Sequence, residues 1–161
     1  MAWEKLASDT LTGVADTVGT TFTTKKFQMA MIHLVDQNFN PRLRYNSNSD
    51  SEYAYRESAN GGADTTQTSI SNGGVIGNNG AVATFTTLSI VYCIDISTEE
   101  KLTIMHSVNQ NSAGAGNSPA RYEIVSKFVP SPDVSITEIN AVNVGAGDFD
   151  TSSNVSVIGT D

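Results

Sequence analysis

Residues 83–110 read ATFTTLSIVYCIDISTEEKLTIMHSVNQ, and this stretch decides the fold. An apolar side chain recurs at every second position from residue 88 to residue 96, and the alternation resumes through Leu102, Ile104, His106 and Val108 after a polar break at 97–100. Period two with β-branched and aromatic residues is typical of strands, and a four-residue break is a common hairpin connection. We therefore predict two antiparallel strands that direct the following side chains into the core: Leu88, Ile90, Tyr92, Ile94, Leu102 and Ile104.

The first of these strands is also apolar on its other parity, where Val91 and Cys93 stand between Ser and Thr residues. Residues 26–35 show the same property, because Met29 and Met31 alternate with Ala30 and Ile32. Apolar residues on both parities indicate a central strand that is covered on both faces. A helix is the alternative for 26–35, but the turn-forming residues that follow favour a strand.

Shorter alternating segments fill the rest of the chain, separated by Gly-, Asn- and Pro-containing turns. An apolar parity that slips within 134–144 indicates a β-bulge in that strand. No internal repeat or linker interrupts the pattern. The prediction is an all-β, single-domain antiparallel β-sandwich over residues 1–161, jelly-roll-like, with about eight or nine strands. The further strands are expected within 3–11, 16–24, 41–45, 52–56, 65–71, 121–129 and 154–158.

Composition restricts the classes of function. The net charge is -8, from 17 acidic and 9 basic residues, and this disfavours binding to a phosphate backbone. No apolar run reaches the ~20 residues of a membrane-spanning helix, and the N-terminus lacks a signal-peptide pattern. We expect a protein made in a cytoplasm, with no nucleic acid partner and no membrane insertion. The single cysteine, Cys93, excludes an intramolecular disulfide and is expected to be a buried, unreactive thiol.

Residues for catalysis or metal binding are scarce. His33 and His106 both lie in predicted strands, no G-x-S-x-G elbow is present, and two histidines with one cysteine are too few for a zinc site. The oxygen-rich loops 46–52 and 148–150 lack the spacing of an EF-hand, so solvated loops are the better interpretation. We therefore predict no enzymatic activity, no cofactor and no metal.

One predicted hairpin has residues suited to a ligand. Arginine forks and aromatic faces beside Asn and Asp side chains are a common way to hold sugars and anions. The same residues make good cross-strand pairs in any exposed hairpin, and we favour that interpretation. The candidate ligand or host-contact surface comprises Arg42, Arg44, Tyr53, Tyr55 and Arg56.

Four segments carry a family resemblance: FTTKK at 22–26, RESANGGADTT at 56–66, GAGNSPAR at 114–121 and VIGTD at 157–161. They resemble small virion-associated β-sandwich proteins encoded by tailed bacteriophages from marine and environmental sources. The resemblance covers most of the chain and brings no catalytic residues with it. It implies a virion component, either a capsid decoration protein or a tail or fibre protein on the particle exterior. The alternative is a carbohydrate-binding module for host attachment.

Assembly is a further expectation. The loops at 72–80 and 109–119 are rich in Gly, Asn and Ser, so they have few side chains of their own to pack. Neighbouring copies would supply the missing contacts, and pairing between subunits would protect exposed strand edges. We expect a homo-oligomer, with a trimer as one form, that contacts other virion proteins and, in the alternative, a host surface glycan.

Overall fold

The structure, a computed structural model, describes residues 2–37, 40–77, 85–110 and 112–161. Parts of the two predicted loops, residues 78–80 and 111, lie outside the described residues. The described residues form β-strands and turns, with no helix among them. The strands are β1 (Glu4–Thr10), β2 (Thr17–Thr21), β3 (Phe27–Gln37), β4 (Pro41–Tyr45), β5 (Tyr53–Ala59), β6 (Thr65–Ile70), β7 (Gly74–Val75), β8 (Phe85–Ile94), β9 (Lys101–Asn109), β10 (Ala120–Phe128), β11 (Glu138–Asn143) and β12 (Asn154–Thr160).

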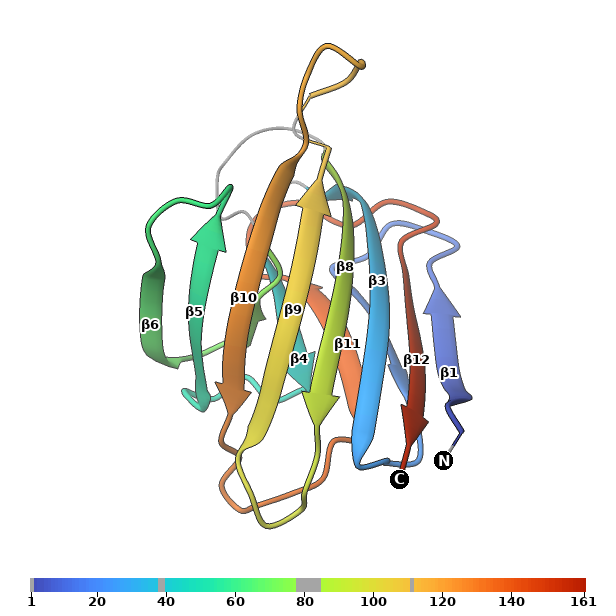
Figure 1. Ribbon diagram of the computed structural model, residues 1–161. Coiled ribbons are helices and arrows are strands. Elements are labelled where there is room, and N and C mark those ends of the chain that lie inside the picture. The colour runs from blue at the N-terminus through green and yellow to red at the C-terminus, as the bar shows by residue number, and fades with distance from the viewer. Residues whose placement is uncertain (1, 38–39, 78–84, 111) are drawn as a thin grey trace.

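The strands form two antiparallel sheets. One has eight strands in the order β1-β12-β3-β8-β9-β10-β5-β6, and the other has four in the order β2-β11-β4-β7. In Figure 1 the eight-stranded sheet faces the viewer, and β4 and β11 pass behind it. The all-β sandwich is thus confirmed, with more strands than the eight or nine expected. The jelly-roll connectivity stays a prediction.

The predicted central hairpin is present as β8 and β9. Ile94 pairs with Leu102, and Tyr92 pairs with Ile104. The strand predicted from residue 26 is β3, which lies on the other side of β8, with Met31 opposite Ile90. These three strands form the centre of the larger sheet.

The predicted β-bulge near residue 136 is wrong. β11 begins only at Glu138 and runs in regular register between β2 and β4. Ile136 precedes the strand and is fully buried, and its backbone N–H donates to Asp95 Oδ2 at 2.8 Å. The apolar parity changes at this point because the chain enters the strand there.

The core lies between the two sheets. The eight-stranded sheet directs large buried side chains from β3, β9 and β10 toward the smaller sheet, among them Leu34, Met105 and Phe128. The ring of Phe128 stacks on Tyr53 with centroids 4.8 Å apart. The smaller sheet supplies the opposite wall, with Leu43, Tyr45, Val18, Ile139 and Ala141.

The predicted core residues of the central hairpin are mostly on the wrong face. Leu88, Tyr92, Leu102 and Ile104 are exposed, and Ile90 and Ile94 are only partly buried. They project away from the four-stranded sheet. The inner face of the hairpin instead carries a largely polar set: Thr87, Ser89, Val91, Cys93, Asp95, Lys101, Thr103, Met105, Ser107 and Asn109.

Polar side chains are tolerated inside because the antiparallel register brings them together in pairs. Ser89 is opposite Ser107, and their hydroxyl oxygens lie 2.7 Å apart. Thr87 Oγ1 donates to Asn109 Oδ1 at 2.9 Å. The Thr103 hydroxyl lies 2.8 Å from the Tyr45 hydroxyl on the opposing sheet. A buried hydroxyl that has such a partner avoids the free-energy cost of losing water.

A buried ion pair closes the inner face at the hairpin turn. Lys101 Nζ lies 3.7 Å from Asp95 Oδ1, too long for a hydrogen bond, and both side chains are almost fully buried. The ammonium donates to the carbonyl oxygens of Ile96 and Glu99 at 2.6 Å each. Asp95 Oδ2 accepts from the Thr24 hydroxyl at 2.6 Å. The pair therefore ties the 95–101 turn to the segment before β3.

Candidate functional site

The outer side of the eight-stranded sheet is the candidate site, and we name it the open face. It comprises the side chains that β3, β8, β9, β10 and β5 direct away from the four-stranded sheet. In the described part of the chain no strand covers this side (Figure 1). Its apolar members are Phe27, Met29, Met31, Leu88, Ile90, Tyr92, Ile94, Leu102, Ile104, Val108 and Val125.

Register places these side chains next to one another. Met29, Tyr92, Ile104 and Val125 face each other in turn across β3, β8, β9 and β10. The exposed fractions are 46% for Tyr92, 54% for Ile104 and 50% for Val125. Contiguous apolar patches on soluble monomers seldom exceed about 600 Å², and larger ones mark interaction sites. The contiguous apolar side chains of the open face make it the candidate interaction surface.

The centre of the open face has no full charge. Among the described side chains that β3, β8 and β9 direct outward, none is Asp, Glu, Lys or Arg. The polar members there are Thr86, His33, His106 and the hydroxyl of Tyr92. Depletion of charge with aromatic and Met side chains is the composition found in the core of a protein–protein interface.

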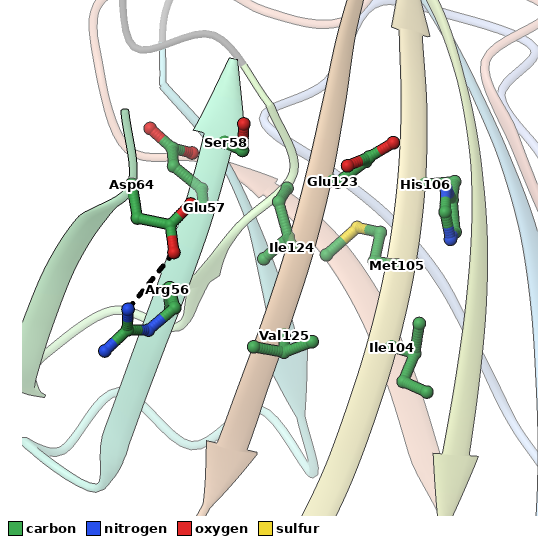
Figure 2. A pocket seen from close by; sticks show the side chains of 10 residues that line it. All are labelled: Arg56, Glu57, Ser58, Asp64, Ile104, Met105, His106, Glu123, Ile124 and Val125. Carbon is green, nitrogen blue, oxygen red and sulfur yellow. Dashed lines mark hydrogen bonds and ion pairs between the residues drawn. The ribbon is translucent and has the colours of Figure 1, made fainter. Parts of the chain in front are cut away.

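Charges gather at the β10 and β5 side. The exposed Arg121 and Glu123 lie there with opposite charges, and four further side chains form ion pairs within the chain. Lys127 Nζ lies 2.9 Å from Glu100, and Arg56 Nη1 lies 3.1 Å from Asp64. Figure 2 shows the Arg56–Asp64 contact beside a hollow lined by Ile104, Val125 and other residues of β5, β9 and β10. The rim of the open face is thus polar and close to electrically neutral.

Two broader hollows lie on the same face. One, of about 670 Å³, runs between β5, β9 and β10 and has Leu102, Ile104 and Val125 in its lining. Another, of about 360 Å³, lies on the β3 side with Phe27, Tyr92 and the half-exposed Trp3. Both are open depressions in a sheet surface with mainly apolar linings, so they suit protruding apolar side chains of a partner.

The ligand surface predicted from sequence is not assembled. β4 and β5 do not pair as a hairpin, because β4 lies between β11 and β7 while β5 lies between β10 and β6. Tyr53 and Tyr55 are 2% and 5% exposed, so their rings face the core. Arg42 and Arg44 project from the smaller sheet, and only Arg56 lies on the open face.

Tyr53 and Arg44 have structural partners, whereas Arg42 Nη1 is buried without a hydrogen-bond partner among the described residues. The Tyr53 hydroxyl donates to the Asn48 carbonyl oxygen at 3.1 Å and accepts from the Tyr45 N–H at 3.1 Å. Burial raises the pKa of Tyr53 well above its ordinary value. Arg44 donates to the backbone and side-chain oxygens of Asn72 at 3.3 and 3.2 Å.

The oxygen-rich loop at 46–52 braces a neighbouring segment. Asn46 Oδ1 accepts from the backbone N–H of Thr137 at 2.8 Å, and Asn46 Nδ2 donates to the Ser135 carbonyl oxygen at 2.8 Å. Glu52 Oε1 accepts from the Ser131 N–H at 2.8 Å. These oxygens hold residues 131–138 in place, so the loop has more structure than the solvated loop we expected.

The loop at 148–150 places Asp148 beside Asp16. The neighbouring Asp16 carboxyl raises the pKa of the exposed Asp148 carboxyl. Phe149, which stands between Asp148 and Asp150 in the sequence, is fully buried and forms a backbone bridge with Ala15. In the described part of the chain no three His, Cys, Asp or Glu side chains are grouped so that they could hold a metal ion.

The histidines and the cysteine are placed by the strand register. His106 is exposed and His33 is half-buried, and both belong to the open face. Cys93 is on the inner face and is 5% exposed, which confirms the buried thiol. Burial raises the pKa of Cys93 to about 11.

Comparisons of the chain with protein-family models, curated proteins and solved structures found no match. Within the described residues, no helix is long and apolar enough to cross a membrane.

Proposed function

We propose that this protein is a non-catalytic structural subunit on the exterior of a bacteriophage particle, a capsid decoration protein or a tail or fibre protein, and that it assembles through the open face. The observation that carries the assembly role is the uncharged apolar centre of that face, with Tyr92 and Ile104 each about half exposed. The particle itself is proposed from the resemblance of four chain segments to phage virion proteins.

The physical case for assembly is the free energy available from covering this surface. Burial of apolar area is favourable by about 25 cal/mol per Å². Ten large apolar residues of the described chain are between 39% and 55% exposed. Seven of them belong to the open face, and Trp3 lies at its edge. Apolar side chains of this kind supply binding free energy and shape, whereas they offer no nucleophile or proton donor. A contact surface is therefore the use that this chemistry favours.

The sugar-binding alternative depended on Tyr53 and Tyr55 as exposed aromatic faces. Both rings are buried against the core, where Tyr53 stacks on Phe128. Arg44 and Arg56 already bind Asn72 and Asp64. Within the described part of the chain Arg42 Nη1 is buried without a hydrogen-bond partner, but Arg42 belongs to the smaller sheet and does not join Arg56 in one surface.

Particle fractionation tests the proposal. Particles from a lysate of the producing phage are banded on a density gradient, probed with antibody to this chain and imaged after immunogold labelling. The chain should band with intact particles and label their outer surface. Its recovery only in the soluble fraction would refute the virion role.

A matched pair of variants tests the surface. Ile104→Glu places a charge at the centre of the open face, while Val14→Glu places the same charge at a residue that is 64% exposed and outside the strands. Ile104→Glu should be lost from particles and Val14→Glu retained. Equal retention of both variants would show that the open face is not needed for assembly on the particle.

A further inference from the structure

We infer that the open face is covered by a second copy of this chain, packed sheet against sheet about a two-fold axis. The inference deepens the proposed function by naming the partner of the same face, and it rests on that proposal for the role of the face in assembly. It makes a separate claim about the purified protein in solution.

The exposed apolar side chains of the open face span four adjacent strands. The seven most exposed apolar residues of the open face are Leu102, Ile104, Val125, Leu88, Tyr92, Met31 and Val108, at 55% to 39% exposure. With their partly buried neighbours they form one apolar surface across β3, β8, β9 and β10. A standard interface takes ~800 Å² from each partner, and a second copy supplies an equally extended apolar surface.

Charge favours self-contact at this face over any contact elsewhere. Each copy has a net charge of -8, so two copies repel wherever their acidic surfaces meet. The described outward side chains of β3, β8 and β9 include no Asp, Glu, Lys or Arg. At the rim, Lys127 and Arg56 are paired with Glu100 and Asp64, and the exposed charges of Arg121 and Glu123 on β10 are opposite in sign. Two copies can therefore approach through the open face with little repulsion.

The strand sequences favour a sheet as the cover. β3 is apolar on its inner side through Ala30 and Ile32, and on its outer side through Met29 and Met31. Strands of this pattern are normally covered on both faces. The four-stranded sheet covers the inner side, and sheets stack face to face at ~10 Å with interdigitating side chains. The identical sheet of a second copy supplies a matching outer layer.

A face that pairs with itself makes an isologous contact, so the smallest assembly is a two-fold dimer. The trimer expected from sequence would need different surfaces to meet. In the dimer, residues of the central row such as Tyr92 and Ile104 lie nearest the middle of the contact. Substitution at that position should consequently have the largest effect on dimerisation.

The test is the molar mass of the purified full chain by light scattering and sedimentation across a concentration series. The wild type should reach twice the 17.1 kDa chain mass at micromolar concentration. Ile104→Glu should raise the dimer dissociation constant by at least about thirty-fold, the scale of an interface hot spot. Val14→Glu, with the same added charge on an exposed valine, should dimerise as the wild type does.

Circular dichroism and thermal unfolding confirm that each variant is folded. If Ile104→Glu does not fold, Val125→Glu replaces it, since Val125 is 50% exposed on the same row. A wild-type monomer up to about 100 μM would overturn the inference. A dimer that survives both open-face substitutions, or one that Val14→Glu disrupts equally, would overturn it as well.

These outcomes are distinguishable from failure of the proposed function. If the wild type is monomeric in solution but Ile104→Glu is lost from particles, the open face still serves assembly. The partner that covers it is then not a second copy. A dimer broken by Ile104→Glu, with no chain found on particles, would retain the inference and refute the virion role.

Discussion

The two faces of the β8–β9 hairpin reverse the usual distribution of side chains. The inner face holds hydrogen-bonded pairs such as Ser89 with Ser107 and the ion pair of Lys101 with Asp95. The outer face holds half-exposed apolar residues such as Tyr92 and Ile104. The comparison shows that polarity alone does not choose the face that turns inward. A polar residue can lie inside when the strand opposite supplies its partner, and an apolar residue can lie outside when another surface is available to cover it.

Among inner-face substitutions, loss of the buried ion pair should reduce the free energy of unfolding most. Lys101→Met leaves Asp95 buried without its cation and removes two hydrogen bonds to the turn, so we expect a loss of ~3–5 kcal/mol in the free energy of unfolding. Urea denaturation measures it. The control is Lys127→Met, which breaks the exposed pair with Glu100 and should cost no more than ~1 kcal/mol. Equal losses in the two variants would contradict a special role for the buried pair.

Two adjacent residues of β10 allow the contributions of the two faces to stability to be compared directly. Ile124 is 2% exposed on the inner side, and Val125 is 50% exposed on the open face. Ile124→Ala should cost ~2–5 kcal/mol through lost burial and a cavity. Val125→Ala should change the free energy of unfolding of the monomer by ~0.5 kcal/mol or less. Urea denaturation under conditions where both variants are monomeric measures the two losses. A larger loss for Val125→Ala than for Ile124→Ala would mean that the faces are misassigned.

Alkaline pH should weaken the inner face through Cys93. Burial raises its pKa from 9.0 to about 11, so the unfolded chain releases the thiol proton at a lower pH than the folded chain does. The stabilisation is complete below pH 9 and is lost as the pH rises toward 11, to a full extent of roughly 2–3 kcal/mol.

Denaturation at a series of pH values from 8 to 9.5 measures the onset of this effect below pH 10, where the unfolded tyrosines ionise and the buried Tyr45 and Tyr53 also contribute. Cys93→Val keeps an apolar side chain at the position and should flatten the pH dependence in that range. An unchanged slope in Cys93→Val would assign the effect to other groups. Native Cys93 should also resist alkylation at pH 8 and react only after unfolding.

The serine pair gives the smallest expected effect and the sharpest view of why polar residues lie inside. Ser89→Ala leaves the Ser107 hydroxyl buried without its partner and should cost ~1–3 kcal/mol. The double variant, with Ser107→Ala as well, should cost less than the sum of the two single changes because neither hydroxyl is left unpaired. Strict additivity in denaturation experiments would show that the hydrogen bond contributes little.

Sequence periodicity was sufficient for much of the fold. The alternation in 83–110 predicted β8 and β9, and the apolar run from residue 26 predicted β3, because period two follows directly from strand geometry. The same periodicity could not assign the core face. Either parity of a strand can face inward, and the pairing of Ser89 with Ser107 is apparent only when the register is known.

A partial signal of the open face was present in the sequence, because some strands are apolar on both parities. We predicted that β8 was covered on both sides, but we placed Leu88 and Leu102 in the core of the single chain. The predicted ligand surface failed for a different reason: chain neighbours β4 and β5 belong to different sheets. The alternation of Tyr53 and Tyr55 with Ala54 and Arg56 was the available signal that the tyrosines face inward.

The position of β12 has a consequence for the order of folding. β12 lies between β1 and β3, so Glu4 pairs with Gly159 and Phe27 pairs with Thr160. During synthesis, β1 has no partner in its sheet until residues 154–160 have left the ribosome. One edge of β3 stays unpaired for the same time. Pairings this distant in sequence slow folding, because a large loop must close before any contact stabilises it. The chain therefore completes its larger sheet only after β12 has been translated, and until then one edge of the apolar strand β3 is open to other nascent copies.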